Sequence, residues 1–175
     1  MNKKIQPKDN ALYNRLKHIV LEEISACGYL AETLKEKQDA IVHNDLHRMN
    51  NLTGTEQILI NKTNALVSKR KEILADIYHK EGLVHETISL THLIEYFEDD
   101  EKLNWLKMQK RLENTVLRIK RLNKENVTLL DTAITFVRDM IHILYNPDEE
   151  LTSVYKKDGS GMDGLGSKNI VDCNI

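Results

Sequence analysis

The chain has 175 residues, 41% hydrophobic and 30% charged, with a formal net charge of −2, which is typical of one ordinary soluble domain. The near-neutral charge argues against bulk binding to nucleic acid, and no apolar run approaches the ~20 residues of a membrane span. Because only 5% of the residues are aromatic, the composition favours long amphipathic helices with Leu and Ile in their seams over a large globular core.

The N-terminus and the cysteines indicate a cytoplasmic protein. "MNKKIQPKDN" is polar and lacks the apolar centre of a signal peptide. Cys27 and Cys173 are too few and too far apart to predict a disulfide framework. Cys27 falls on the apolar face of the first predicted helix, where we expect a small buried hydrophobe.

The first predicted helix begins at Asp9 or Asn10, whose side-chain oxygens can accept from the free amides of a first turn. Apolar residues then recur at helical spacing as far as Met49. The pattern weakens only at "NNLTG", residues 50–54. The sequence therefore predicts one helix of about 40 residues, about 60 Å long.

A second helix is predicted from about Thr55 to Ile77, and Gly82 interrupts the pattern after it. The segment "LVHETISLTHLIEYF" then predicts a shorter middle helix, for which Thr87 is the candidate N-cap.

The last helix carries the clearest pattern. Asp99 or Asp100 can cap it, with acidic residues at its positive end. Steps of three and four residues then mark a coiled-coil-like seam, interrupted only by Thr115 and Asn126. The seam comprises Trp105, Met108, Leu112, Thr115, Ile119, Leu122, Asn126, Leu129, Ala133, Phe136, Met140 and Ile143.

A second set of apolar residues widens this stripe toward the C-terminal end of the helix. They are Leu130, Ile134, Val137, Ile141 and Leu144. Because a wide stripe faces more than one direction, we expect this half of the helix to contact more than one neighbour.

The composition changes at Pro147, which cannot continue a helix. Four glycines follow between residues 159 and 166, beside the apolar Tyr155, Ile170, Val171 and Ile175. We therefore predict a helical bundle domain over residues 1–146 and a flexible tail over residues 147–175.

The predicted fold class is all-α. We expect an elongated antiparallel helical bundle or coiled coil with three long helices, a short middle helix and a flexible C-terminal tail. The third long helix returns along the first, because such amphipathic helices cannot bury their stripes alone.

Catalytic chemistry finds little support. His43 and His47 lie four apart, a spacing that on one helix suits a zinc site. However, "HNDLH" lacks the catalytic Glu, so two exposed histidines are the simpler interpretation. The glycine-rich "GSGMDGLG" lacks the flanking strand and helix of a phosphate loop. We expect no enzyme activity, no metal and no cofactor.

Basic side chains occupy the outer side of the last helix: Lys107, Lys110, Arg111, Arg118, Lys120, Arg121 and Lys124. Such a face can hold an acidic partner, a membrane surface or RNA. No aromatic residues interleave with the basic ones to stack bases, so we interpret the face as a solvated one.

The ordered set of segments resembles the FlgN family of flagellar type III export chaperones, over roughly residues 8 to 175. "TEQILINKTNALVSKRKEIL" is similar to the second helix of that family, and "LVHETISLTHLIEYF" to its short middle segment. "LNKENVTLLDTAITFVRDMIHIL" resembles the family signature. "SVYKKDGS" resembles its Tyr-x-x-Asp-Gly turn, and "NIVDCNI" its terminal apolar-Asp motif.

The resemblance implies a cytoplasmic protein without catalytic activity. It implies binding to hook–filament junction proteins, the hook-associated subunits, before their export. It also implies that the chaperone prevents their premature association and delivers them to the cytoplasmic domain of the export-gate membrane protein. Tyr155 matches the family tyrosine tied to docking on that gate; alternatively, its ring folds back onto the end of the bundle.

For subunit binding we single out apolar residues of the last helix and the tail: Leu129, Ala133, Phe136, Val137, Met140, Ile143, Leu144, Ile170 and Val171. The subunit site lies on the last helix, in the tail, or on both. The competing interpretation is that these residues fill the protein's own core. An alternative function is a structural coiled coil that dimerises through the seam from Trp105 to Ile143, with Asn126 fixing its register.

Overall fold

The computed structural model describes residue 5, residues 10–83 and residues 87–145. It contains helices α1 (Ala11–Val42), α2 (Leu46–Glu81), α3 (Leu90–Glu95) and α4 (Asp99–Tyr145). Within these ranges there is no strand, and a single isolated bridge joins Ile5 to Phe97. The predicted all-α fold, with three long helices and a short middle one, is confirmed.

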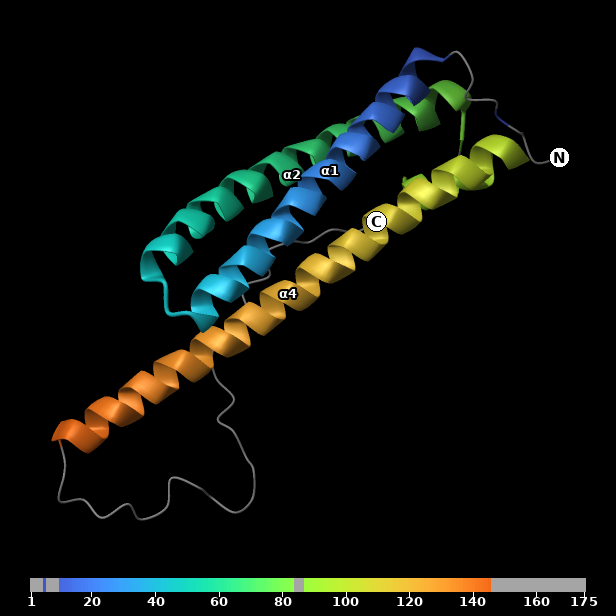
Figure 1. Cartoon of the computed structure of the whole chain (residues 1–175). Helices are drawn as coiled ribbons and strands as arrows, with labels where there is room; N and C mark the ends of the chain where they lie inside the picture. Colours follow the sequence, from blue (N-terminus) through green and yellow to red (C-terminus); the bar gives the residue numbers. More distant parts are fainter. Residues whose placement is uncertain (1–4, 6–9, 84–86, 146–175) are drawn as a thin grey trace.

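Helix α1 lies between the other two long helices (Figure 1). α2 runs antiparallel to α1, so that residues late in one helix meet residues early in the other. Thus Glu23 of α1 pairs with Arg70 of α2, and Lys37 with Glu56. α4 runs in the same direction as α1, as expected for a helix that returns along the first.

The prediction of one helix as far as Met49 is wrong, because α1 ends at Val42. Asn44 adopts a left-handed backbone with φ 54°, which asparagine tolerates better than most residues. Asp45 then caps α2, and its carboxylate accepts from the Arg48 amide at 2.9 Å. The chain therefore reverses direction at residues 43–45.

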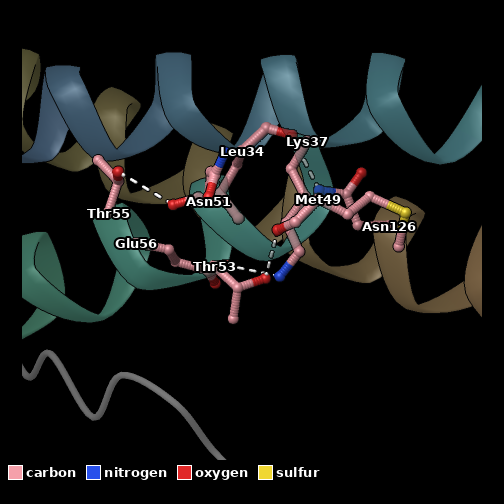
Figure 2. A network of polar contacts seen from close by, with 8 residues as sticks. All are labelled: Leu34, Lys37, Met49, Asn51, Thr53, Thr55, Glu56 and Asn126. Atoms are coloured by element: carbon pink, nitrogen blue, oxygen red, sulfur yellow. Dashed lines mark hydrogen bonds and ion pairs between the residues drawn. The ribbon is translucent and has the colours of Figure 1, made fainter. Parts of the chain in front are cut away.

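The segment "NNLTG", which we expected to end the first helix, lies inside α2. The Thr53 and Thr55 hydroxyls donate back to the carbonyl groups of Met49 and Asn51, at 2.9 and 3.2 Å (Figure 2). Gly54 lowers helix stability by only about 1 kcal/mol. The weak helix propensity of residues 50–54 is therefore outweighed by the helix that continues on either side of them.

Two other helix ends lie where the sequence predicts them. Asn10 caps α1, as predicted, by accepting from the Leu12 amide at 3.1 Å. α2 ends at Gly82, as predicted, with φ 62°, a conformation that glycine adopts without a Cβ clash.

Two cap predictions need correction. Ser89, not Thr87, caps the short helix, because its hydroxyl accepts from the His92 amide at 3.2 Å. Asp99 and Asp100 lie within the first turn of α4 rather than before it, where their charge still complements the positive end of the helix.

Aromatic rings fill the core at the end of the bundle where α1 begins and α4 begins. The Phe97 ring packs edge-on against Tyr13, with centroids 5.8 Å apart, and lies 5.6 Å from Trp105. All three side chains are buried. Ile5 closes this end, and its amide donates to the Tyr96 carbonyl at 2.8 Å.

A buried ion pair joins α1 to α2 in the middle of the bundle. The Arg70 guanidinium donates to both carboxylate oxygens of Glu23, at 2.8 and 3.3 Å, and both side chains are only 3% exposed. Burial raises the pKa of Glu23 above its ordinary 4.5, while the charge and hydrogen bonds of Arg70 oppose that rise. The carboxylate is therefore held in the apolar interior by its partner.

We expect Arg70→Met to lower the free energy of unfolding by about 3–5 kcal/mol, because it leaves the Glu23 carboxylate buried without a partner. Glu23→Leu combined with Arg70→Met should recover most of the loss. Urea denaturation followed by circular dichroism measures both variants. Equal destabilisation of the single and double variants would mean that packing around Arg70, and not its charge, is what matters.

The Arg70→Met deficit should also depend on pH. Without the guanidinium, burial alone acts on Glu23 and raises its folded-state pKa further above 4.5. A raised folded-state pKa contributes stability that is lost as the pH rises through it, so the deficit should be larger at about pH 8 than at about pH 5. Denaturation curves at the two pH values test this, with the double variant as the control that should lack the dependence.

Candidate partner-binding surface

Helix α4 is much longer than the helix it packs against. It spans 47 residues and α1 spans 32, which at ~1.5 Å per residue is about 70 Å against about 48 Å. α4 therefore continues beyond the turn that joins α1 to α2 (Figure 1). We call its residues 127–145 the α4 overhang.

Asn126 is the last fully buried residue of α4. Its side chain is 3% exposed, and its Nδ2 donates to the Leu34 carbonyl of α1 at 2.9 Å (Figure 2). One helical turn further along α1, Gln38 Nε2 donates to Glu125 at 3.0 Å. α1 continues for one to two more turns and ends at Val42, so the last turns of α1 lie beside the base of the overhang.

The predicted seam of α4 is thus divided into two parts. As far as Asn126 its residues lie in the bundle, and the buried ones are Trp105, Leu112, Ile119, Leu122 and Asn126. Met108 and Thr115 are half-buried. Beyond Asn126 the same seam is first half-buried, at Leu129 and Ala133, and then exposed from Phe136 onward.

The overhang exposes its apolar side chains. Leu129 and Ala133, at its base, are half-buried. The remaining predicted partner-binding residues of α4 are between 47% and 73% exposed: Phe136, Val137, Met140, Ile143 and Leu144. Within the part of the chain that the structure describes, these five do not belong to the core. Ile170, Val171 and Tyr155 lie outside the described residues.

Sequence reasoning gave less weight to other apolar residues of the same surface. Val127, Ile134, Ile141 and Tyr145 are also exposed on the overhang, and Leu130 is half-buried at its base. The signal for Leu130, Ile134 and Ile141 was present, since they belong to the set that widens the seam. Their exposure depends on where α1 ends, which we had placed too far along the chain.

The histidine pair does not form the arrangement that its spacing suggested. His43 lies in the turn after α1, with its Nδ1 2.8 Å from the Asp39 carbonyl oxygen. His47 lies in α2, with its Nε2 3.2 Å from Asn51 Nδ2. The helix break at Asn44 separates the two imidazoles. Among the described residues, no group of three or more metal-ligating side chains lies together.

The basic face of α4 is exposed along the outer side of the bundle. Arg118 pairs with Glu32 of α1 at 2.9 Å, and Arg121 lies 3.7 Å from Glu125. A shallow depression on this face is lined by Lys107, Lys110, Arg111, Asn114, Thr115 and Arg118. These contacts with solvent and neighbouring acids agree with the interpretation of a solvated face.

The structure also bears on the environment of Cys27 and on the search for a membrane span. Cys27 is 1% exposed on the packed face of α1, as predicted for a small buried hydrophobe. No helix among the described residues combines the length and the apolar character that a membrane crossing requires.

A comparison with protein families decides the relationship of the chain. The family model described as FlgN protein matches residues 1–161. The chain belongs to the FlgN family. The resemblance of its segments to that family is thereby confirmed. No curated protein and no solved structure matches the chain.

Membership in the FlgN family indicates the general kind of function that the chain has. The FlgN family is a family of flagellar export chaperones, which bind flagellar proteins and are in general not enzymes. The overhang is an exposed apolar helix face among the described residues, and exposed apolar patches are a common feature of protein interaction sites.

We expect the overhang to contribute little to the stability of the free FlgN protein. Phe136→Ser should change the free energy of unfolding by less than about 0.5 kcal/mol, as for other surface substitutions. Leu112→Ala, at a seam position that is 0% exposed, should cost about 2–5 kcal/mol. Thermal or urea denaturation compares the two. A large loss in the Phe136 variant would place that ring in the core of the full chain.

Proposed function

We propose that this protein is a cytoplasmic export chaperone for hook–filament junction proteins, the hook-associated subunits. It keeps these subunits from associating prematurely and delivers them to the cytoplasmic domain of the flagellar export-gate membrane protein. The single observation that carries the proposal is the α4 overhang, whose apolar stripe has no covering helix among the described residues.

The chemistry of the overhang suits a helical client. An amphipathic helix binds by laying its apolar face into an apolar surface, with anchors spaced three and four residues apart. The overhang offers that spacing, from Leu129 through Phe136 to Ile143. We propose that the client subunit presents amphipathic terminal helices, whose apolar faces are exposed while the subunit is free. Covering such a helix removes the surface through which subunits associate too early.

A structural homodimer through the whole seam is disfavoured by the packing of α4. The part from Trp105 to Asn126 is already buried within one chain, so a second copy would have to displace α1. The overhang alone remains for self-association. Size exclusion with light scattering distinguishes a homodimer from a complex with a client.

For the tail we retain the division into a bundle domain over residues 1–146 and a tail over residues 147–175. We propose that Tyr155 docks on the export gate and that Ile170 and Val171 contribute to subunit binding. A tyrosine offers a large contact area with a polar tip, which suits a transient docking site. The support for these roles is the family membership and the Tyr-x-x-Asp-Gly motif.

The first test is light scattering after size exclusion, on the chain alone and mixed with a hook–filament junction subunit. We expect a stoichiometric complex with the native chain. Phe136→Ser with Met140→Ser should weaken binding at least about tenfold, because both side chains are exposed anchors. Thr135→Ser, on the polar side of the same helix, is the matched control. A persistent homodimer that forms no complex would contradict the proposal.

The docking role of Tyr155 has its own test. Tyr155→Ala should leave junction-subunit binding unchanged and weaken binding to the cytoplasmic domain of the export gate by about tenfold or more. Calorimetry with each partner measures the two affinities. Equal loss of both would show that Tyr155 does not serve gate docking specifically.

A further inference from the structure

The α4 overhang carries two heptad seams side by side. The first seam consists of Leu129, Ala133, Phe136, Met140 and Ile143. The second seam consists of Leu130, Ile134, Val137, Ile141 and Leu144. Each advances in alternating steps of four and three residues, and the second is displaced from the first by one residue. One such seam is the contact line for one neighbouring helix.

The angular spread of the apolar residues agrees with two contact lines. At about 100° per residue, the apolar side chains of the overhang fill an arc of about 200°. The polar ones fill the remaining arc without interruption: Thr128, Asp131, Thr132, Thr135, Arg138, Asp139 and His142. A helix face that packs on one neighbour needs a stripe little wider than about 100°. One client helix would therefore leave about half of this surface in water.

The bundle itself shows what covers each seam when α4 is packed. Between Trp105 and Asn126 the first seam lies against α1, with Asn126 bonded to Leu34. Three heptads before Leu130, the second-seam position is Gln109. Its Nε2 donates to Thr91 Oγ1 of α3 at 2.8 Å. At the level of Gln109, α3 thus covers the second seam while α1 covers the first.

The second seam becomes apolar only on the overhang. Its positions along the bundle after Gln109 are Glu113, Val116, Lys120 and Asn123, and of these only Val116 is buried and apolar. On the overhang every position is aliphatic. After Gln109 the bundle therefore buries chiefly the first seam, and the second seam is apolar at every position only on the overhang.

We propose that the overhang binds two helices of a single client subunit, one along each seam. This proposal rests on the proposed chaperone function. It adds the form in which the client is bound, which is a pair of amphipathic helices. Each client helix lies about 8–10 Å from the α4 axis. Because the two seams point about 100° apart on α4, the two client helices lie about 12–15 Å from each other. A pair from one chain fits better than two separate chains, because the second helix binds at a high effective concentration.

The end of the bundle marks where the first client helix sits. The first seam continues directly from the interface that α1 occupies, and α1 ends beside the base of the overhang. Val42 and Leu46, on either side of the turn, are 61% and 70% exposed. A helix on the first seam would extend the path of α1 and meet these two side chains at its end.

The experiment uses the full chain, a hook–filament junction subunit, and two fluorescent peptides with the sequences of its N-terminal and C-terminal amphipathic helices. The first-seam variant is Phe136→Ser with Met140→Ser, and the second-seam variant is Ile134→Ser with Ile141→Ser. All four positions are exposed, so circular dichroism should show unchanged folding. Thr132→Ser with Thr135→Ser is the control on the polar face. Anisotropy titrations give the dissociation constants.

We expect each peptide to lose affinity at least about tenfold with one seam variant and less than about twofold with the other. The intact subunit should lose affinity with both seam variants and keep it with the polar-face control. If the native chain binds the subunit but one seam variant changes nothing, one helix is bound and the two-helix inference is overturned while the chaperone function stands. If both variants weaken the same peptide equally, the two-helix inference is also overturned and the chaperone function again stands. If the native chain binds no subunit, the proposed function fails as well.

Discussion

The difference in length between α1 and α4 determines which apolar side chains of this protein are covered. Both helices start at the same end of the molecule, where Tyr13, Phe97 and Trp105 pack together. α1 ends at Val42, whereas α4 continues to Tyr145. The stripe on α4 does not weaken where its cover stops. Because the apolar stripe of α4 continues past the end of α1, it leaves an apolar surface that only another chain segment can bury.

Polar groups fix where that surface begins. Apolar seams alone tolerate sliding by a heptad, since the same residue types recur every seven positions. The buried Asn126 amide donates to the Leu34 carbonyl, and the Glu23–Arg70 pair is buried between α1 and α2. A shift in register would leave these groups without partners in an apolar interior, which costs several kcal/mol. We infer that these contacts contribute specificity of register more than stability.

Polar contacts also lie at the end of the bundle from which the overhang extends. Near the turn, Lys37 of α1 and Glu56 of α2 form an ion pair at 2.7 Å, close to Asn126 (Figure 2). On one side of these contacts lies the core of the protein, and on the other the exposed overhang. We therefore expect substitutions on the exposed overhang to leave the bundle folded, so that the proposed binding and the stability can be measured separately.

The sequence by itself determined the all-α class, the helix end at Gly82, the Asn10 cap and the heptad seam of α4. These features depend on local spacing, backbone conformation and hydrogen bonds within a few residues, which a sequence pattern records directly. The wide stripe after Leu129 was also visible, because its residues share one face of one helix. The family relationship was also predictable from the sequence, since the FlgN family model matches residues 1–161.

The tertiary structure decided the position of the turn and the exposure of the overhang. Asn44 and Asp45 reverse the chain where we expected helix, and "NNLTG" stays helical because the helix on either side outweighs its weak helix propensity. A seam residue such as Leu112 and one such as Phe136 have the same pattern in the sequence. Only the level at which α1 ends makes the first a core residue and the second a surface residue, since burial depends on neighbours that are distant in the chain.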